Sequence, residues 1–378
     1  MPLDEQNASV QGQLFLGLDT EEDEEGGGAS SEPFNPTKIR IESRNVSVYH
    51  LVHRMEEGSL HLPPDFQQPR GSWASGAQSR LIESLMIRLP IPPLYVAATE
   101  EGDWLVVDGL PRLSVLQHFI SKKDLRLVAL EFLTLHNGKT FDELPRAMQR
   151  RIEETPIPVF LIEPGTPPEV KFTIFKRLNT GGLPLSPQEI RHVLNQGPAA
   201  ELLAQLADEE AFQRVAGRFL RNLRMSDREC VLRFLAFATT SYESYHSGNL
   251  DAFLDTQMRN LGRRPKAELD ALARRFIRAM RVAYDIFGDE AFRKRDKQGE
   301  ASKPLNKALF EAWSVNLDAL SDEEIARLIE RKATLLEGFI ELSHRSDFDK
   351  SLAQGTGSVA KVKLRFEEIG KLIRRVLA

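Results

Sequence analysis

The sequence lacks the features that define several large classes of protein. Its 378 residues include a single cysteine, Cys230, which excludes an internal disulfide framework and a cysteine-based zinc site. No apolar run approaches the roughly 18 residues that a membrane span requires, and the N-terminus has neither the basic nor the apolar region of a secretory signal. These absences predict a cytoplasmic protein without a membrane partner.

Several catalytic signatures are missing as well. The chain contains no P-loop, no Gly-x-Ser-x-Gly nucleophile elbow and no His-Glu-x-x-His zinc motif. Its formal net charge of −5 gives the chain as a whole no attraction for nucleic acid. The composition, with 41% apolar and 28% charged residues, is that of a globular protein with ample material for a core.

Negative charge is concentrated in one N-terminal segment, residues 19–25, which three glycines follow. This composition predicts a disordered acidic tail over residues 1–33. Two interpretations of the tail are open. It either keeps the protein soluble, or it mimics nucleic acid by occupying a basic groove of this chain or of a partner.

Hydrophobic spacing predicts a mixed α+β domain over residues 34–195 and an all-helical domain over residues 196–378. In the first domain the pattern indicates strands at 39–48, 94–98, 104–107, 125–133 and 157–162. The same domain shows helical spacing at 48–55, 75–89, 111–120, 140–154 and 166–178. Ser75 with Gln78, Ser186 with Glu189, and Ser226 with Glu229 have the spacing of helix caps. In the second domain, helices are expected at 226–235, 269–287, 305–317, 322–342 and 359–377.

The most informative stretch of the first domain is the strand-to-helix corner from Val106 to Leu113. An apolar strand reaches Asp108 and Gly109, and Arg112 follows in the first turn of the next helix. Phosphates commonly bind at such corners. Because helix starts favour acidic residues, Arg112 is expected to serve another purpose. It either contacts a phosphate or forms a structural ion pair with Asp108.

Three further polar segments lie where an element begins or ends, which is where sites concentrate. Gln67 and Arg70 precede the helix at residue 75. A second segment, with donors suited to phosphate oxygens, runs into Gly181-Gly182 and contains Arg177, Asn179 and Thr180. The third opens a helix and contains Gln188, Glu189 and Arg191. The second segment also suits a plain helix stop, and Glu189 also suits a capping box.

Four segments, taken in order, resemble a bacterial family typified by the N-terminal domain of the GmrSD restriction endonuclease. They are Gln78–Leu85 with Pro90-Ile91-Pro92-Pro93, then Val107–Leu113, Arg177–Gly182 and Gln188–Arg191. The resemblance covers about residues 45–195. It implies a ParB/sulfiredoxin-like fold for the first domain, with a nucleotide site centred on Asp-Gly-x-x-Arg and a role in phage defence.

The resemblance also implies roles for individual residues. Asp108 and Arg112 would be the catalytic pair, with Asp108 holding Mg²⁺ or orienting a water and Arg112 neutralising phosphate charge. A nucleoside triphosphate would be the ligand. The nucleotide- and phosphate-binding residues would be Gln67, Arg70, Gly109, Arg177, Asn179, Thr180, Gln188, Glu189 and Arg191.

The sequence departs from the family pattern in three ways. Leu110 and Pro111 stand where members usually carry glutamine, and Gln67-Gln68 stands for the usual Gln-Arg. The usual ββα-metal nuclease is absent, since only His246 and His344 follow His192. These departures predict a nucleotide- or DNA-binding sensor of a phage-defence system with weak or lost turnover. The alternatives are an active NTPase or DNA-nicking enzyme, and a scaffold that recruits a separate effector protein.

Overall fold

The computed structural model of the chain describes residues 40–61, 73–178, 186–217, 220, 225–295 and 304–378. Residue contacts divide the chain before Ser186 into two compact units. We call them the mixed unit, described from residue 40 to 178, and the helical unit, which begins at Ser186. The predicted acidic tail, residues 1–33, lies outside the described residues.

A five-stranded sheet organises the mixed unit, with strand order β1-β5-β3-β4-β2. The β1–β5 and β3–β4 pairs are antiparallel, whereas β3–β5 and β2–β4 are parallel. Apart from the β3–β4 hairpin, neighbours in the sheet come from distant parts of the sequence. The strands are β1 (Ile41–Ser47), β2 (Leu60–His61), β3 (Leu94–Ala98), β4 (Trp104–Asp108) and β5 (Pro156–Ile162).

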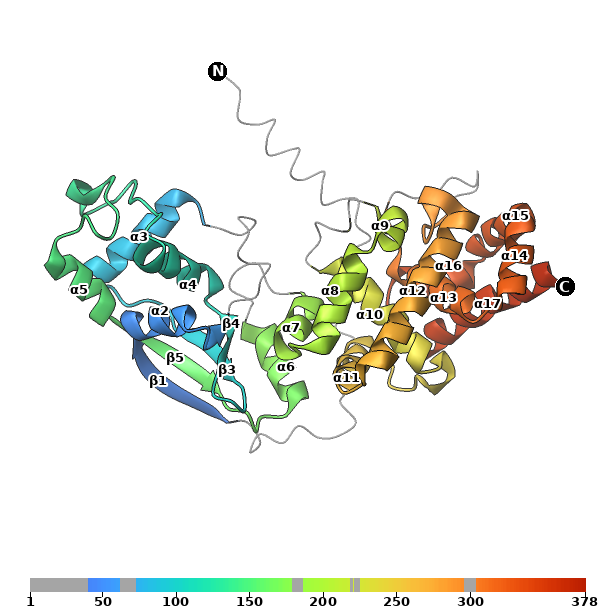
Figure 1. The fold of residues 1–378 in the computed structure, drawn as a ribbon, viewed down its shortest axis with the longest axis horizontal. Helices are drawn as coiled ribbons and strands as arrows, with labels where there is room; N and C mark the ends of the chain where they lie inside the picture. Colours follow the sequence, from blue (N-terminus) through green and yellow to red (C-terminus); the bar gives the residue numbers. More distant parts are fainter. Residues whose placement is uncertain (1–39, 62–72, 179–185, 218–219, 221–224, 296–303) are drawn as a thin grey trace, which may run out of the picture. The chain divides into compact units, whose positions relative to one another are not determined.

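Side-chain alternation along the strands gives the sheet two different faces. Val96 and Val106 belong to the main core of the unit, whereas Ala97 and Val107 are buried outside that core. A further helix, α6 (Pro168–Leu178), contacts β4. The main core is covered by four helices, seen above the sheet in Figure 1: α2 (Val48–Glu56), α3 (Ser75–Met86), α4 (Leu110–Leu116) and α5 (Arg146–Glu154).

The described elements after Ser186 are helices, which confirms the predicted change from a mixed to an all-helical architecture. The long helix α12 packs against α8, α9 and α13 around one large apolar core. Within that core, burial raises the pKa of the Cys230 thiol to about 12. The helices are α7 (Pro187–Leu194), α8 (Pro198–Asp208), α9 (Glu210–Ala216), α10 (Ser226–Thr239), α11 (Leu250–Gly262), α12 (Lys266–Phe287), α13 (Lys307–Asp318), α14 (Asp322–Glu330), α15 (Lys332–Ser343), α16 (Ser346–Ala353) and α17 (Val359–Leu377).

The expected strand at 125–133 is wrong, because most backbone N–H groups there donate to side chains and not to a neighbouring strand. The Val128 N–H donates to Ser79 Oγ over 2.9 Å, and the N–H groups of residues 131–133 donate to the Glu83 carboxylate. Apolar spacing alone cannot distinguish such a segment from a strand.

Two predicted helix caps are also wrong. Helix α3 begins after Ala74 and α10 after Met225, and neither has a side-chain cap. The cap predicted at Ser186, by contrast, is confirmed as a complete capping box with Glu189. The single helix expected over 322–342 is instead two helices, α14 and α15.

Candidate functional site: the corner between β4 and α4

Gly109 allows β4 to turn directly into α4. Its φ of +102° lies in the region that L side chains rarely adopt. A Cβ at this position would lie 2.1 Å from Leu94 Cδ2 on the neighbouring strand β3. The corner therefore requires glycine both for its backbone conformation and for the close approach of β3.

Arg112 ties this corner to the segment that enters β3. Its guanidinium donates to the Pro92 carbonyl, to the Pro93 carbonyl over 3.1 Å and to Asp108 Oδ2 over 3.0 Å. Only 11% of the side chain is exposed. Burial lowers the pKa of Arg112, and the nearby Asp108 opposes that shift. The structural ion pair considered from the sequence is thus present.

Asp108 is the more accessible partner of this pair, with 37% of its side chain exposed. Leu110, in contrast, is buried in the main core of the mixed unit. Its side chain therefore offers no polar group at a position where the related family usually has glutamine. Among the residues that the structure brings together at the corner, Asp108 is the one suited to a cation.

The structure places the remaining predicted residues of the mixed unit only in part. Arg177 lies on α6, the helix that contacts β4. Gln67, Arg70, Asn179 and Thr180 fall outside the described residues. The corner itself therefore consists of Asp108, Gly109 and Arg112.

The fourth predicted segment belongs to the helical unit, not to the mixed unit. Glu189 accepts the Ser186 N–H over 2.6 Å as the second half of the capping box. Gln188 is also buried, with 1% of its surface exposed, and its Oε1 lies 3.5 Å from Arg191.

Arg191 connects α7 to α11. It is 1% exposed, its Nε donates to Asp255 over 2.6 Å and its Nη2 donates to Asp251. Burial alone would lower the pKa of Arg191, but the two carboxylates raise it above its ordinary value. This arginine therefore holds two helices of the helical unit together, and the predicted phosphate role has no support in this geometry.

Glu83 is a buried acidic residue whose structural role in the mixed unit was not predicted. It is 2% exposed, and its carboxylate accepts the backbone N–H groups of Glu131, Phe132 and Leu133 over 3.0, 2.7 and 2.7 Å. Burial by itself would raise the pKa of Glu83, but these bonds lower it below its ordinary value. The signal in the sequence was an acidic residue between Ile82 and Leu85 on an otherwise apolar helix face.

A second unpredicted group is a chain of buried charges in the helical unit. Glu311 and Arg365 are both fully buried and form an ion pair. Arg233 bridges Glu311 to Glu229 with contacts of 3.1 and 2.8 Å. At the end of the chain of charges, Lys307 Nζ forms an ion pair with Glu229 Oε2 over 2.7 Å. The chain joins α10, α13 and α17 through the core.

None of the described helices is long and apolar enough to cross a membrane. Within the same residues, no group of three or more histidine, cysteine, aspartate or glutamate side chains is arranged to hold a metal ion.

Comparison with known families agrees with the motifs of the first domain. Residues 48–194 match the family described as GmrSD restriction endonuclease, N-terminal domain. The resemblance inferred from the ordered motifs is thereby confirmed. The GmrSD match runs from the start of α2 to the end of α7, so it includes the corner and one helix of the helical unit. No curated protein matches the chain.

Proposed function

We propose that this chain is a sensing or regulatory component of a restriction-type bacterial defence system. In this proposal the mixed unit binds a nucleoside triphosphate or DNA through its phosphates, and a separate effector protein performs cleavage. The restriction setting is supported by the GmrSD match over residues 48–194.

The bonding of Arg112 is the observation that favours binding over turnover. An arginine that stabilises phosphoryl transfer must aim its N–H groups at the transferred group. A guanidinium has five such groups, and Arg112 directs three hydrogen bonds to acceptors inside the mixed unit. Arg112 therefore stabilises the shape of the corner. Few of its N–H groups remain to donate to the charge that develops on a transferred phosphoryl group.

Asp108 is the proposed contact to the ligand through Mg²⁺. Carboxylate oxygens are hard ligands that Mg²⁺ accepts together with phosphate oxygens. The proposed phosphate donors are the predicted residues before α3 and around the end of α6: Gln67, Arg70, Arg177, Asn179 and Thr180. Arg191 is excluded from this set because its guanidinium is buried against Asp251 and Asp255.

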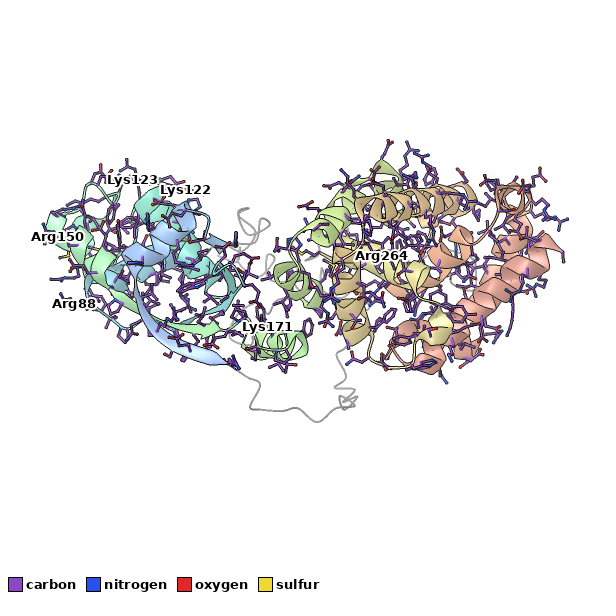
Figure 2. All side chains as sticks on the ribbon, turned by 60° about the horizontal axis from the view of Figure 1, so that its bottom comes forward. Arg88, Lys122, Lys123, Arg150, Lys171 and Arg264 are labelled. Carbon is purple, nitrogen blue, oxygen red and sulfur yellow. The ribbon has the colours of Figure 1, made fainter. Side chains whose placement is uncertain are left out.

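A nucleotide is the main ligand in this proposal, since the labelled cations of the mixed unit in Figure 2 are spread over separate places. Among the cations labelled on the mixed unit in Figure 2, Arg88 and Arg150 lie at one end, and Lys171 lies at the other end on α6. Lys122 and Lys123 lie together at a third place on the unit. An extended nucleic-acid backbone is bound best by a continuous basic stripe, whereas a nucleotide needs only one corner.

Calorimetry with each nucleoside triphosphate, with and without Mg²⁺, tests the proposal. We expect the wild-type chain to bind in a Mg²⁺-dependent manner and Asp108→Asn to lose that dependence. Lys123→Ala is the matched control, because Lys123 forms an exposed pair with Asp142 in the same unit. Thermal melting of each variant separates loss of the ligand from loss of the fold.

Phosphate release measured on the same samples distinguishes a sensor from an enzyme. Equal release by wild type and Asp108→Asn agrees with a sensor. Release by wild type alone would establish the alternative of an active NTPase. Calorimetry with duplex DNA completes the set: if wild type binds neither nucleotide nor DNA, the proposal is wrong and the scaffold alternative is the one that remains.

A further inference from the structure

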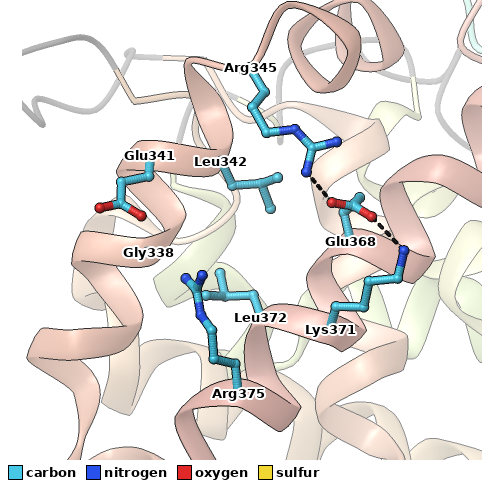
Figure 3. Close-up of a pocket in the computed structure, with 8 residues that line it drawn as sticks. All are labelled: Gly338, Glu341, Leu342, Arg345, Glu368, Lys371, Leu372 and Arg375. Carbon is cyan, nitrogen blue, oxygen red and sulfur yellow. Dashed lines mark hydrogen bonds and ion pairs between the residues drawn. The ribbon is translucent and has the colours of Figure 1, made fainter.

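The helical unit contains a cavity of about 410 Å³ between α15 and α17. Figure 3 shows its lining, with the apolar side chains of Leu342 and Leu372 flanked by charged groups. A volume of this size is within the range of pockets that hold small molecules. The cavity lies in the helical unit, so it is separate from the corner of the mixed unit.

Gly338 allows α15 to approach α17 at this point. A Cβ there would lie 2.5 Å from Leu372 Cδ1 and 2.8 Å from Arg375 Nη2. The glycine therefore leaves room for both side chains at the wall of the cavity.

Two of the three cations around the cavity are already neutralised. Glu368 pairs with Arg345 and, over 2.8 Å, with Lys371. Hydrogen bonding to Lys371, together with Arg345, lowers the pKa of Glu368, so the carboxylate stays ionised. Arg345 also pairs with Asp347 over 2.6 Å. These pairs fix one wall of the cavity.

Arg375 is the third cation, and it differs from the other two. Among the described residues it has no ion pair or hydrogen-bond partner, and Figure 3 draws no interaction from its guanidinium. The remaining charge in the lining is Glu341. The cavity thus offers an apolar surface beside a guanidinium that has all its N–H groups available.

We propose that this cavity binds a small amphiphilic anion. Its apolar part lies on Leu342 and Leu372, and its carboxylate or phosphate group accepts hydrogen bonds from Arg375. A guanidinium suits both groups because it can donate two parallel N–H bonds to either. Glu341 opposes the anion and limits its affinity. The site gives the helical unit a ligand of its own, independent of the proposed nucleotide.

Ligand-observed NMR titration of the full chain with four probes tests the site. Hexyl phosphate and hexanoate carry both an apolar chain and an anionic group, whereas hexanol lacks the charge and inorganic phosphate lacks the chain. We expect both amphiphilic anions to bind more tightly than hexanol and inorganic phosphate. The stronger of the two identifies the anionic group that the site prefers.

Three variants test whether the probes bind to the residues that line the cavity. Arg375→Ala should weaken hexyl phosphate about tenfold, the effect of losing a charge-assisted hydrogen bond, while Glu341→Gln should strengthen it. Arg374→Ala is the matched control, because Arg374 is the exposed neighbour on α17 and does not line the cavity. Gly338→Ala should weaken every probe with an apolar chain, since the added methyl group occupies the wall.

Equal binding of hexyl phosphate by Arg375→Ala and Arg374→Ala would overturn the proposal, as would equal binding of hexyl phosphate and hexanol by the wild type. Circular dichroism of each variant verifies that the helical unit is folded, so a loss of binding reports on the cavity alone.

Discussion

The two units stabilise their buried charged side chains in different ways. In the mixed unit, Glu83 accepts three backbone N–H groups, and Arg112 donates to two backbone carbonyls. In the helical unit, Glu311 is satisfied mainly by other side chains, those of Arg233 and Arg365. One unit uses charge to shape loops, and the other uses it to join helices.

The difference follows from where each fold leaves backbone groups free. Inside a helix, the backbone N–H and C=O groups hydrogen-bond to each other. A charged side chain buried between helices therefore needs a side chain of opposite charge. A connecting segment has no such ladder and can offer its backbone to one charged side chain. Arg365 agrees with this rule, because it also donates to the carbonyls of Ser351 and Thr356 near the end of α16.

The largest effect that tests this comparison is expected at Glu311. Glu311→Gln leaves Arg365 and Arg233 buried without their shared counter-charge, which should lower the free energy of unfolding by about 3–5 kcal/mol. Urea denaturation measures the loss. Glu268→Gln is the control, because Glu268 pairs with Arg264 on an exposed helix surface and should change little. A loss below about 1 kcal/mol would show that the buried charges act independently.

A smaller loss is expected from Gly109→Ala, which tests whether backbone shape defines the corner. The positive φ and the 2.1 Å approach to Leu94 Cδ2 should together cost about 2–4 kcal/mol. Gly102→Ala is the matched control, because Gly102 has a φ of +90° but no heavy atom within 4 Å of the added Cβ. If both variants melt at the same temperature, the contact with Leu94 contributes nothing.

The smallest of these effects is expected for Glu83→Gln, at about 1–3 kcal/mol near neutral pH. The pKa of Glu83 is lowered in the folded state, so its stabilisation is present above the ordinary pKa of 4.5 and is lost as the pH falls through the lowered value. The gap in stability between wild type and Glu83→Gln should therefore shrink under acid conditions. Glu131→Gln, with its side chain 59% exposed, serves as the control. A gap that stays constant with pH would contradict the bonds to the backbone.

Much of the fold was predictable because its signals are local. The hairpin of β3 and β4, the strand β5 and the long helices of the helical unit all follow from apolar spacing. The strand expected at 125–133 failed because its pairing partner was a side chain of α3, which no local pattern reveals. The caps expected at Ser75 and Ser226 failed because a matching spacing does not require the bond to form.

The candidate site was predictable to a smaller degree. Spacing identified the corner, and Asp108 and Arg112 do lie within hydrogen-bonding distance. Spacing could not show that the Arg112 guanidinium donates to the backbone carbonyls of Pro92 and Pro93, because those carbonyls are about 20 residues away in sequence. Nor could it show that Arg191 faces Asp251 and Asp255, which lie 60 and 64 residues later in the sequence.

By itself, the sequence determined the family match, the change from mixed to helical architecture and the presence of a strand-to-helix corner at Asp108, Gly109 and Arg112. These properties depend on short-range spacing and on the conformational limits of single residues. The tertiary structure alone decided which charges are available to a ligand. That outcome depends on partners brought together from distant segments: Arg112 and Arg191 are engaged internally, whereas Asp108 stays accessible and Arg375 has no described partner.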